Sequence, residues 1–155
     1  MTTALNIRPL LEAIKARLGE LTDGMTFSTS AGGSAPLVIY IYRVPNDILA
    51  DGGDPYPFAL IRPRGGADGD GLGTTRVWLL FGLTNSEEDG AGDEQLESLA
   101  AAVCRLAENQ AFAPHALRPE ITFRFGQDDT GAQAHPEYQL TADLIFDRES
   151  VYLNH

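Results

Sequence analysis

The chain has 155 residues, about the length of one domain, and its mixture of 43% hydrophobic and 21% charged residues is typical of globular proteins. Its 22 acidic residues outnumber the 11 basic ones, and the net charge of −11 argues against nucleic-acid binding, which requires clustered cations. One cysteine rules out an internal disulfide framework, and the lack of a long apolar run or a signal-peptide pattern predicts a soluble intracellular protein that does not span a membrane.

The first part of the chain predicts one amphipathic helix followed by a strand. Leucine and isoleucine recur at helical spacing over residues 4–22, and Pro9 suits the first turn of that helix. A loop is expected over 28–36, where Gly, Ser and Pro gather. Residues 37–44 then predict a strand with two apolar faces, and 45–55 an irregular connection.

The middle of the chain predicts a hairpin and a second helix. Strands are expected over residues 58–63 and 75–84, joined by a flexible, Gly-rich loop at about 64–74. After an acidic stretch, Asp93 is the expected N-cap of a helix that ends near Asn109.

Two alternating strands, over residues 120–126 and 138–147, complete the pattern. The element order is α-β-β-β-α-β-β, and the helix between the third and fourth strands allows one crossover. The sequence therefore predicts a single α+β domain over residues 1–155. Its fold is a two-layer sandwich, with a mostly antiparallel sheet of about five strands and two amphipathic helices on one face.

The Gly-rich loop contains "GGADGDGLG" at residues 65–73, which is close to a calcium-binding repeat of β-rolls. A single copy of that repeat lacks the ligands that neighbouring turns supply. Asp68 and Asp70 have the spacing of two ligands in a helix–loop–helix calcium site, but the twelfth position is Leu79, where a glutamate is required. A plain connection is therefore favoured over a metal site.

No group of residues predicts catalysis or a cofactor, and we expect the protein not to be an enzyme. The histidines have no regular spacing and no cysteine at ligand distance, and no serine stands in a nucleophile-elbow motif. Cys104, beside Val103 on the apolar stripe of the second helix, is expected to be at least partly buried.

The middle strands carry apolar and aromatic residues on both faces, although two helices cover only one. The second face is therefore expected to be a protein interface, unless residues 45–57 fold back over it. The residues expected on it are Tyr40, Tyr42, Trp78, Leu80 and Arg124.

The sequence resembles tail terminator proteins of long-tailed bacteriophages and their prophages. The resemblance is carried by "DPYPFALIRPRGG", the acidic Gly-rich loop, "TTRVWLLFGLTNSEEDG", an amphipathic helix and the final "EYQLTADLIF" strand. It implies a structural virion protein, assembled in the host cytoplasm, that forms a hexameric ring at the head-proximal end of the tail. Such a ring stops tube polymerisation and takes part in head–tail joining.

The partners that the resemblance implies are further copies of the chain, the tail tube protein and the head-side connector protein. DNA would pass through the ring without specific binding, as the acidic charge suggests. In a ring, Asp68 and Asp70 would meet arginines of a neighbouring subunit or of the tube. The alternatives are another neck or tail-completion protein that joins head and tail, or a small calcium- or ligand-binding module.

Overall fold

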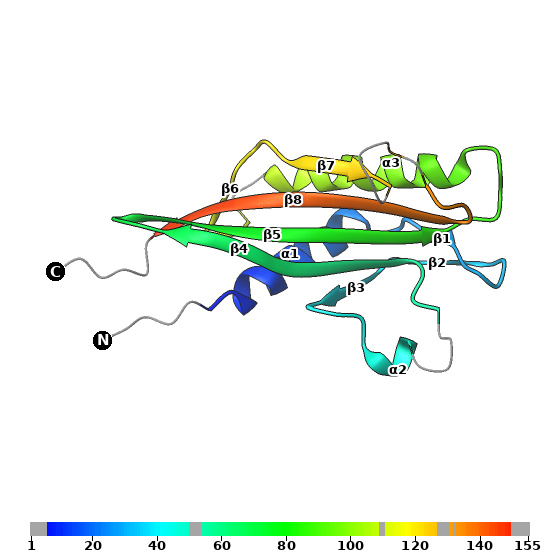
Figure 1. The fold of residues 1–155 in the computed structure, drawn as a ribbon, viewed down its shortest axis with the longest axis horizontal. Coiled ribbons are helices and arrows are strands. Elements are labelled where there is room, and N and C mark those ends of the chain that lie inside the picture. Colours follow the sequence, from blue (N-terminus) through cyan, green and yellow to red (C-terminus); the bar gives the residue numbers. More distant parts are fainter. Residues whose placement is uncertain (1–5, 50–53, 109–110, 127–130, 132, 150–155) are drawn as a thin grey trace.

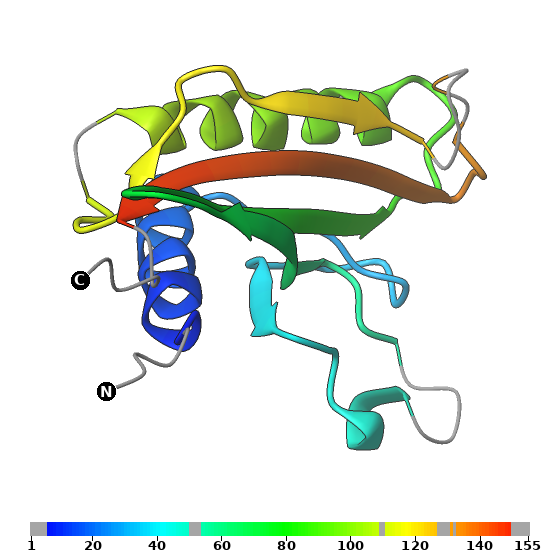
Figure 2. The same cartoon turned by 60° about the vertical axis from the view of Figure 1, so that its left-hand side comes forward.

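A computed structural model of the protein describes residues 6–49, 54–108, 111–126, 131 and 133–149. They form a curled, mostly antiparallel sheet with two long helices packed on one of its faces (Figure 1; Figure 2). This arrangement confirms the predicted α+β fold class.

The helices and strands have the following bounds. The helices are α1 (Arg8–Leu21), the short α2 (Asn46–Leu49) and α3 (Ala91–Cys104), which continues into the 3-10 turn η2 (Arg105–Ala107). The main sheet contains β3 (Val38–Ile41), β4 (Phe58–Asp68), β5 (Leu72–Thr84), β6 (Ala116–Leu117), β7 (Thr122–Phe125) and β8 (Glu137–Glu149). A separate two-stranded ribbon pairs β1 (Phe27–Ser28) with β2 (Ser34–Ala35).

The main sheet has the strand order β3-β4-β5-β8-β6, and β7 also pairs with β8. β3 runs parallel to β4, and the other neighbouring strands are antiparallel. α3 carries the chain from β5 across β8 to β6, which is the crossover that the sequence allowed. The parallel β3–β4 connection through residues 42–57 was not predicted.

The core lies between the sheet and the two long helices. Strand alternation and helical periodicity together predict the residues that line this core. Full burial of each large apolar side chain stabilises the folded state by about 1.5–3 kcal/mol. The buried positions are Leu10, Leu11, Ile14 and Leu18 of α1, Val77, Leu79, Phe81 and Leu83 of β5, Leu96, Leu99 and Val103 of α3, and Tyr138, Leu140, Ala142, Leu144 and Phe146 of β8.

The two long helices begin in different ways. Pro9 lies in the first turn of α1, as predicted, because its missing N–H has no acceptor there. The N-cap of α3 is Gly90, with φ of 90°, and not Asp93 as predicted. Asp93 lies instead in the first turn, where its charge favours the helix N-terminus. Residues 4 and 5 and Asn109, which the predictions included in helices, lie outside the described residues.

The prediction of a loop over residues 64–74 is wrong. β4 continues to Asp68 and β5 begins at Leu72, so that only residues 69–71 connect the two strands. Two partners explain this extension: β8 pairs with β5 over the whole of that segment, and Arg148 binds the carboxylate of Asp68. Tertiary contacts here outweigh the low strand propensity of glycine.

Three smaller corrections follow from the tertiary structure. Part of the predicted loop at residues 28–36 forms the β1–β2 ribbon. Cys104 is exposed, because it lies one residue after Val103 and so points away from the apolar stripe. Phe123, on the apolar side of β7, remains 40% exposed, since β7 lies at the edge of the sheet.

Candidate interaction surface on the open sheet face

The sheet face that α1 and α3 do not cover is called the open face here. On β5 the even-numbered residues from Arg76 to Gly82 point to it, because the odd-numbered ones face the core. α2 has no buried residues and lies to one side of the sheet (Figure 2), so this helix does not cover the face. The described part of the 45–57 segment thus does not support the alternative in which it folds over the sheet.

One part of the open face is apolar. Tyr40, Leu60 and Leu80 form a row across β3, β4 and β5, with Leu60 paired to both of its neighbours. The next row joins Val38, which is 44% exposed, to Phe58 and Gly82. A side chain at position 82 would collide with the Phe58 ring, so this glycine makes room for the aromatic ring on the sheet surface.

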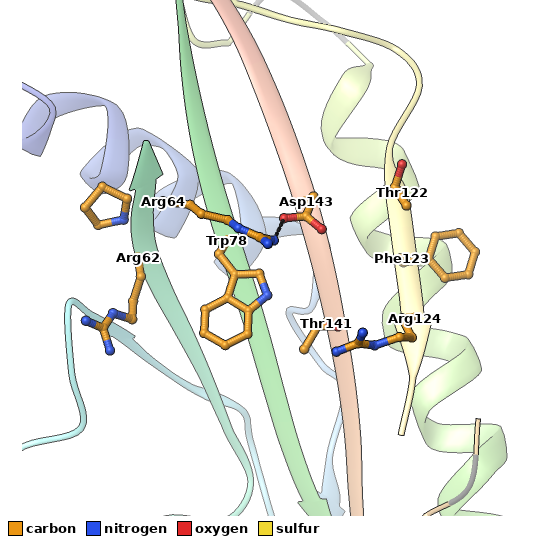
Figure 3. A pocket seen from close by; sticks show the side chains of 9 residues that line it. Arg62, Arg64, Trp78, Thr122, Phe123, Arg124, Thr141 and Asp143 are labelled. Carbon is orange, nitrogen blue, oxygen red and sulfur yellow. Dashed lines mark hydrogen bonds and ion pairs between the residues drawn. The ribbon is translucent and has the colours of Figure 1, made fainter. Parts of the chain in front are cut away.

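Beside this apolar area lies a concave region around Trp78, called the Trp78 groove, with a volume of about 570 Å³ (Figure 3). Arg62 and Asp143 are the direct partners of Trp78 on the neighbouring strands. Arg64 stands at a β-bulge and reaches past Trp78 to the Asp143 carboxylate, with an Nη1–Oδ1 distance of 2.6 Å. The other polar residues that line the groove include Thr122, Arg124 and Thr141.

The charge of this surface is opposite to that of the whole chain. Arg62, Arg64, Arg76 and Arg124 lie on it, and in the described part of the chain Arg62 and Arg76 take part in no salt bridge. At the end of the face, Arg118 binds Asp147 through two nitrogens, and this hydrogen bonding lowers the pKa of the Asp147 carboxyl. Asp147 is therefore charged at neutral pH and neutralises Arg118, whereas Arg62 and Arg76 have no such partner among the described residues.

The sequence did not predict this cluster of arginines. In the linear order they are separated by up to 62 positions, between Arg62 and Arg124, and appear scattered. The strand alternation nevertheless indicated part of it, because residues two positions apart on a strand point to the same face. Arg62 therefore shares a face with Leu60 on one strand, and Arg76 with Trp78 on the other. The pairing of β7 with β8, which brings Arg124 to Thr141, could not be read from that alternation.

Four of the predicted interface residues lie on the open face, namely Tyr40, Trp78, Leu80 and Arg124. Tyr42 does not share this position. Its φ of 71° takes it out of the strand alternation, and the Arg8 guanidinium of α1 lies 5.3 Å from the centre of its ring. Tyr42 thus lies beside α1.

Asp68 and Asp70 lie at the end of the β4–β5 hairpin, away from the Trp78 groove. Asp68 accepts a hydrogen bond of 2.6 Å from Arg148 Nη1, and the side chains are 19% and 8% exposed respectively. Gly73 leaves space for this guanidinium, since a side chain there would collide with it. Asp70 lies exposed in the turn. The cation at Asp68 is therefore an arginine of the same chain.

The described residues contain no group of three or more His, Cys, Asp or Glu side chains placed to hold a metal ion. The helices of this part of the chain are too short or too polar to cross a membrane.

No protein-family model matches the chain, and no curated protein sequence matches it significantly.

Proposed function

We propose that this protein is a tail terminator subunit of a long-tailed bacteriophage or prophage. In this function, six copies form a ring that caps the tail tube, stops its polymerisation and provides the surface to which the head-side connector binds. The protein acts by binding and not by catalysis, and its site of action is the head-proximal end of the virion tail.

The observation that supports this proposal best is the open face. A sheet with helices on one side and the exposed Val38 and half-buried Tyr40, Leu80 and Trp78 on the other leaves a partly exposed apolar and aromatic surface. Such surfaces, when rimmed by polar residues, mark protein–protein contacts. Repeating one heterologous contact closes a ring, which is the assembly that a terminator requires.

The acidic charge supports the same function. A ring of subunits that each carry −11 repels the phosphates of DNA, so DNA can pass through without binding to the wall. The arginines around Trp78 would be covered by the neighbouring subunit.

The decisive experiment removes the gene from a phage that produces this protein. Electron microscopy of the lysate should show tail tubes of uncontrolled length without heads, and supplying the wild-type protein should restore uniform, head-attached tails. Normal tails in the deletion strain would contradict the proposal. Tails of normal length that lack heads would indicate a head–tail joining protein instead.

A further inference from the structure

Two arginines of the open face have no acidic partner among the described residues. Arg62 and Arg76 make no salt bridge among the described residues, and the one bridge of Arg64 goes to Asp143, on the same face. Water solvates these exposed cations in the free protein. A partner that covered the face would therefore have to supply carboxylates, because a buried arginine without an acidic partner is costly.

The same molecule has a surplus of carboxylates elsewhere, in the segment of residues 86–94, called the acidic segment. It contains Glu87, Glu88, Asp89, Asp93 and Glu94 and no basic residue. These five side chains belong to exposed residues, and none of them takes part in a salt bridge within the described chain.

The acidic segment is held in a defined position. Asn85, which is 3% exposed, donates its backbone N–H to the Pro136 carbonyl at 2.8 Å, and its side-chain oxygen accepts a hydrogen bond from Glu87 N. The segment then leads into the first turn of α3. A fixed segment loses less conformational entropy when it binds than a mobile one.

The two charged regions cannot meet within one chain. The acidic segment follows the end of β5 at Thr84, six residues or about 20 Å of extended strand beyond Trp78. It also connects to α3, on the helix-covered side of the sheet (Figure 1). Attraction between the two regions is therefore available only between different copies of the chain.

We propose that the acidic segment of one copy docks on the open face of the next copy, at the Trp78 groove. Glu87 and Glu88 then face Arg62, which lines the groove, and Arg76, which lies beside the groove two residues before Trp78 on β5. This inference rests on the proposed function and identifies the contact that closes the ring. The contact joins two different surfaces, so it is heterologous, and an open chain of subunits keeps a free groove at one end and a free acidic segment at the other until the ring closes. It also provides local attraction between subunits whose net charges repel each other.

Charge reversal with purified full-length protein tests this contact. Arg62→Glu/Arg76→Glu and Glu87→Arg/Glu88→Arg should each weaken self-association, measured by sedimentation over a range of concentrations, by about tenfold or more. An equimolar mixture of the two variants should associate again, because each variant presents a surface that matches the other. Lys15→Glu/Arg105→Glu, which makes the net charge more negative by the same amount as the arginine variant but at exposed helix positions, is the matched control for that variant.

Several outcomes would overturn the inference. One is a mixture that stays dissociated, and another is a wild-type chain that stays monomeric up to millimolar concentration. A third is a loss of association in the arginine variant alone, which would indicate a contact between two open faces. If the reversed variants do not fold, as judged by circular dichroism, Arg62→Gln/Arg76→Gln and Glu87→Gln/Glu88→Gln should each weaken association instead. The tail-length experiment is independent: uniform tails in the deletion strain would refute the terminator function without changing the result of the mixing experiment.

Discussion

His115 shows how the fold changes the chemistry of a single residue. Its imidazole lies edge-on to the Phe146 ring, with the ring centres 6.4 Å apart, just before β6. Partial burial lowers the pKa of His115 below its ordinary value of 6.5, and the positive charge of Arg148 lowers it further. The folded protein therefore favours the neutral imidazole.

The pKa of His115 predicts how stability depends on pH. Below about pH 6.5 the unfolded chain binds a proton at this residue more readily than the folded one, so its contribution to stability is lost as the pH falls. We expect His115→Gln to remove this contribution, so that the loss of stability between pH 7 and pH 5 becomes smaller. Urea denaturation at several pH values measures the free energy of unfolding of both proteins. If this free energy changes equally with pH in the two proteins, the lowered pKa of His115 is contradicted.

At the scale of elements, the β4–β5 hairpin depends on its contact with the end of β8. Arg148 donates hydrogen bonds to Asp68 and to Thr75 Oγ1, and its side chain is only 8% exposed. A guanidinium that is so well covered needs its acidic partner. The ion pair thus fixes the end of β4 to β8, and the hydrogen bond to Thr75 fixes the beginning of β5.

This contact predicts that two aspartates of similar sequence context behave differently. Asp68→Asn should lower the free energy of unfolding by about 1–3 kcal/mol, because Arg148 loses its charged acceptor. Asp70→Asn, the same change at an exposed turn position, should stay within about 0.5 kcal/mol of the wild type. Chemical denaturation of the isolated proteins compares them, and equal effects would show that the ion pair does not hold the hairpin.

At the scale of the whole molecule, the two faces of β5 predict different consequences of truncating a side chain. Trp78 lies partly exposed on the open face, whereas Phe81 is fully buried in the core. We expect Trp78→Ala to reduce self-association and tail termination with little change in melting temperature. Phe81→Ala should instead cost about 3–5 kcal/mol of stability, because it leaves a cavity. Thermal melts measure the loss of stability, and sedimentation measures the loss of self-association. A large loss of stability in Trp78→Ala would show that this side chain supports the core and contradict its role in an interface.

The sequence by itself determined the elements whose periodicity is strong. Helical spacing predicted the buried stripes of α1 and α3, and period-two alternation predicted the inward faces of β5 and β8, because a side chain's direction follows directly from the backbone repeat. The same alternation predicted that Trp78 and Leu80 point away from the core.

Only the tertiary structure decided which distant residues meet. Glycines at positions 65, 66, 69, 71 and 73 predict a loop, and the strands extend through most of it because β8 supplies hydrogen-bond partners and Arg148 a counter-charge. The positive φ of Tyr42 and the exposure of Cys104 depend likewise on local packing. The Trp78 groove is the clearest case: its arginines come from β4 and β7, and strand pairing, which is non-local, brings them together.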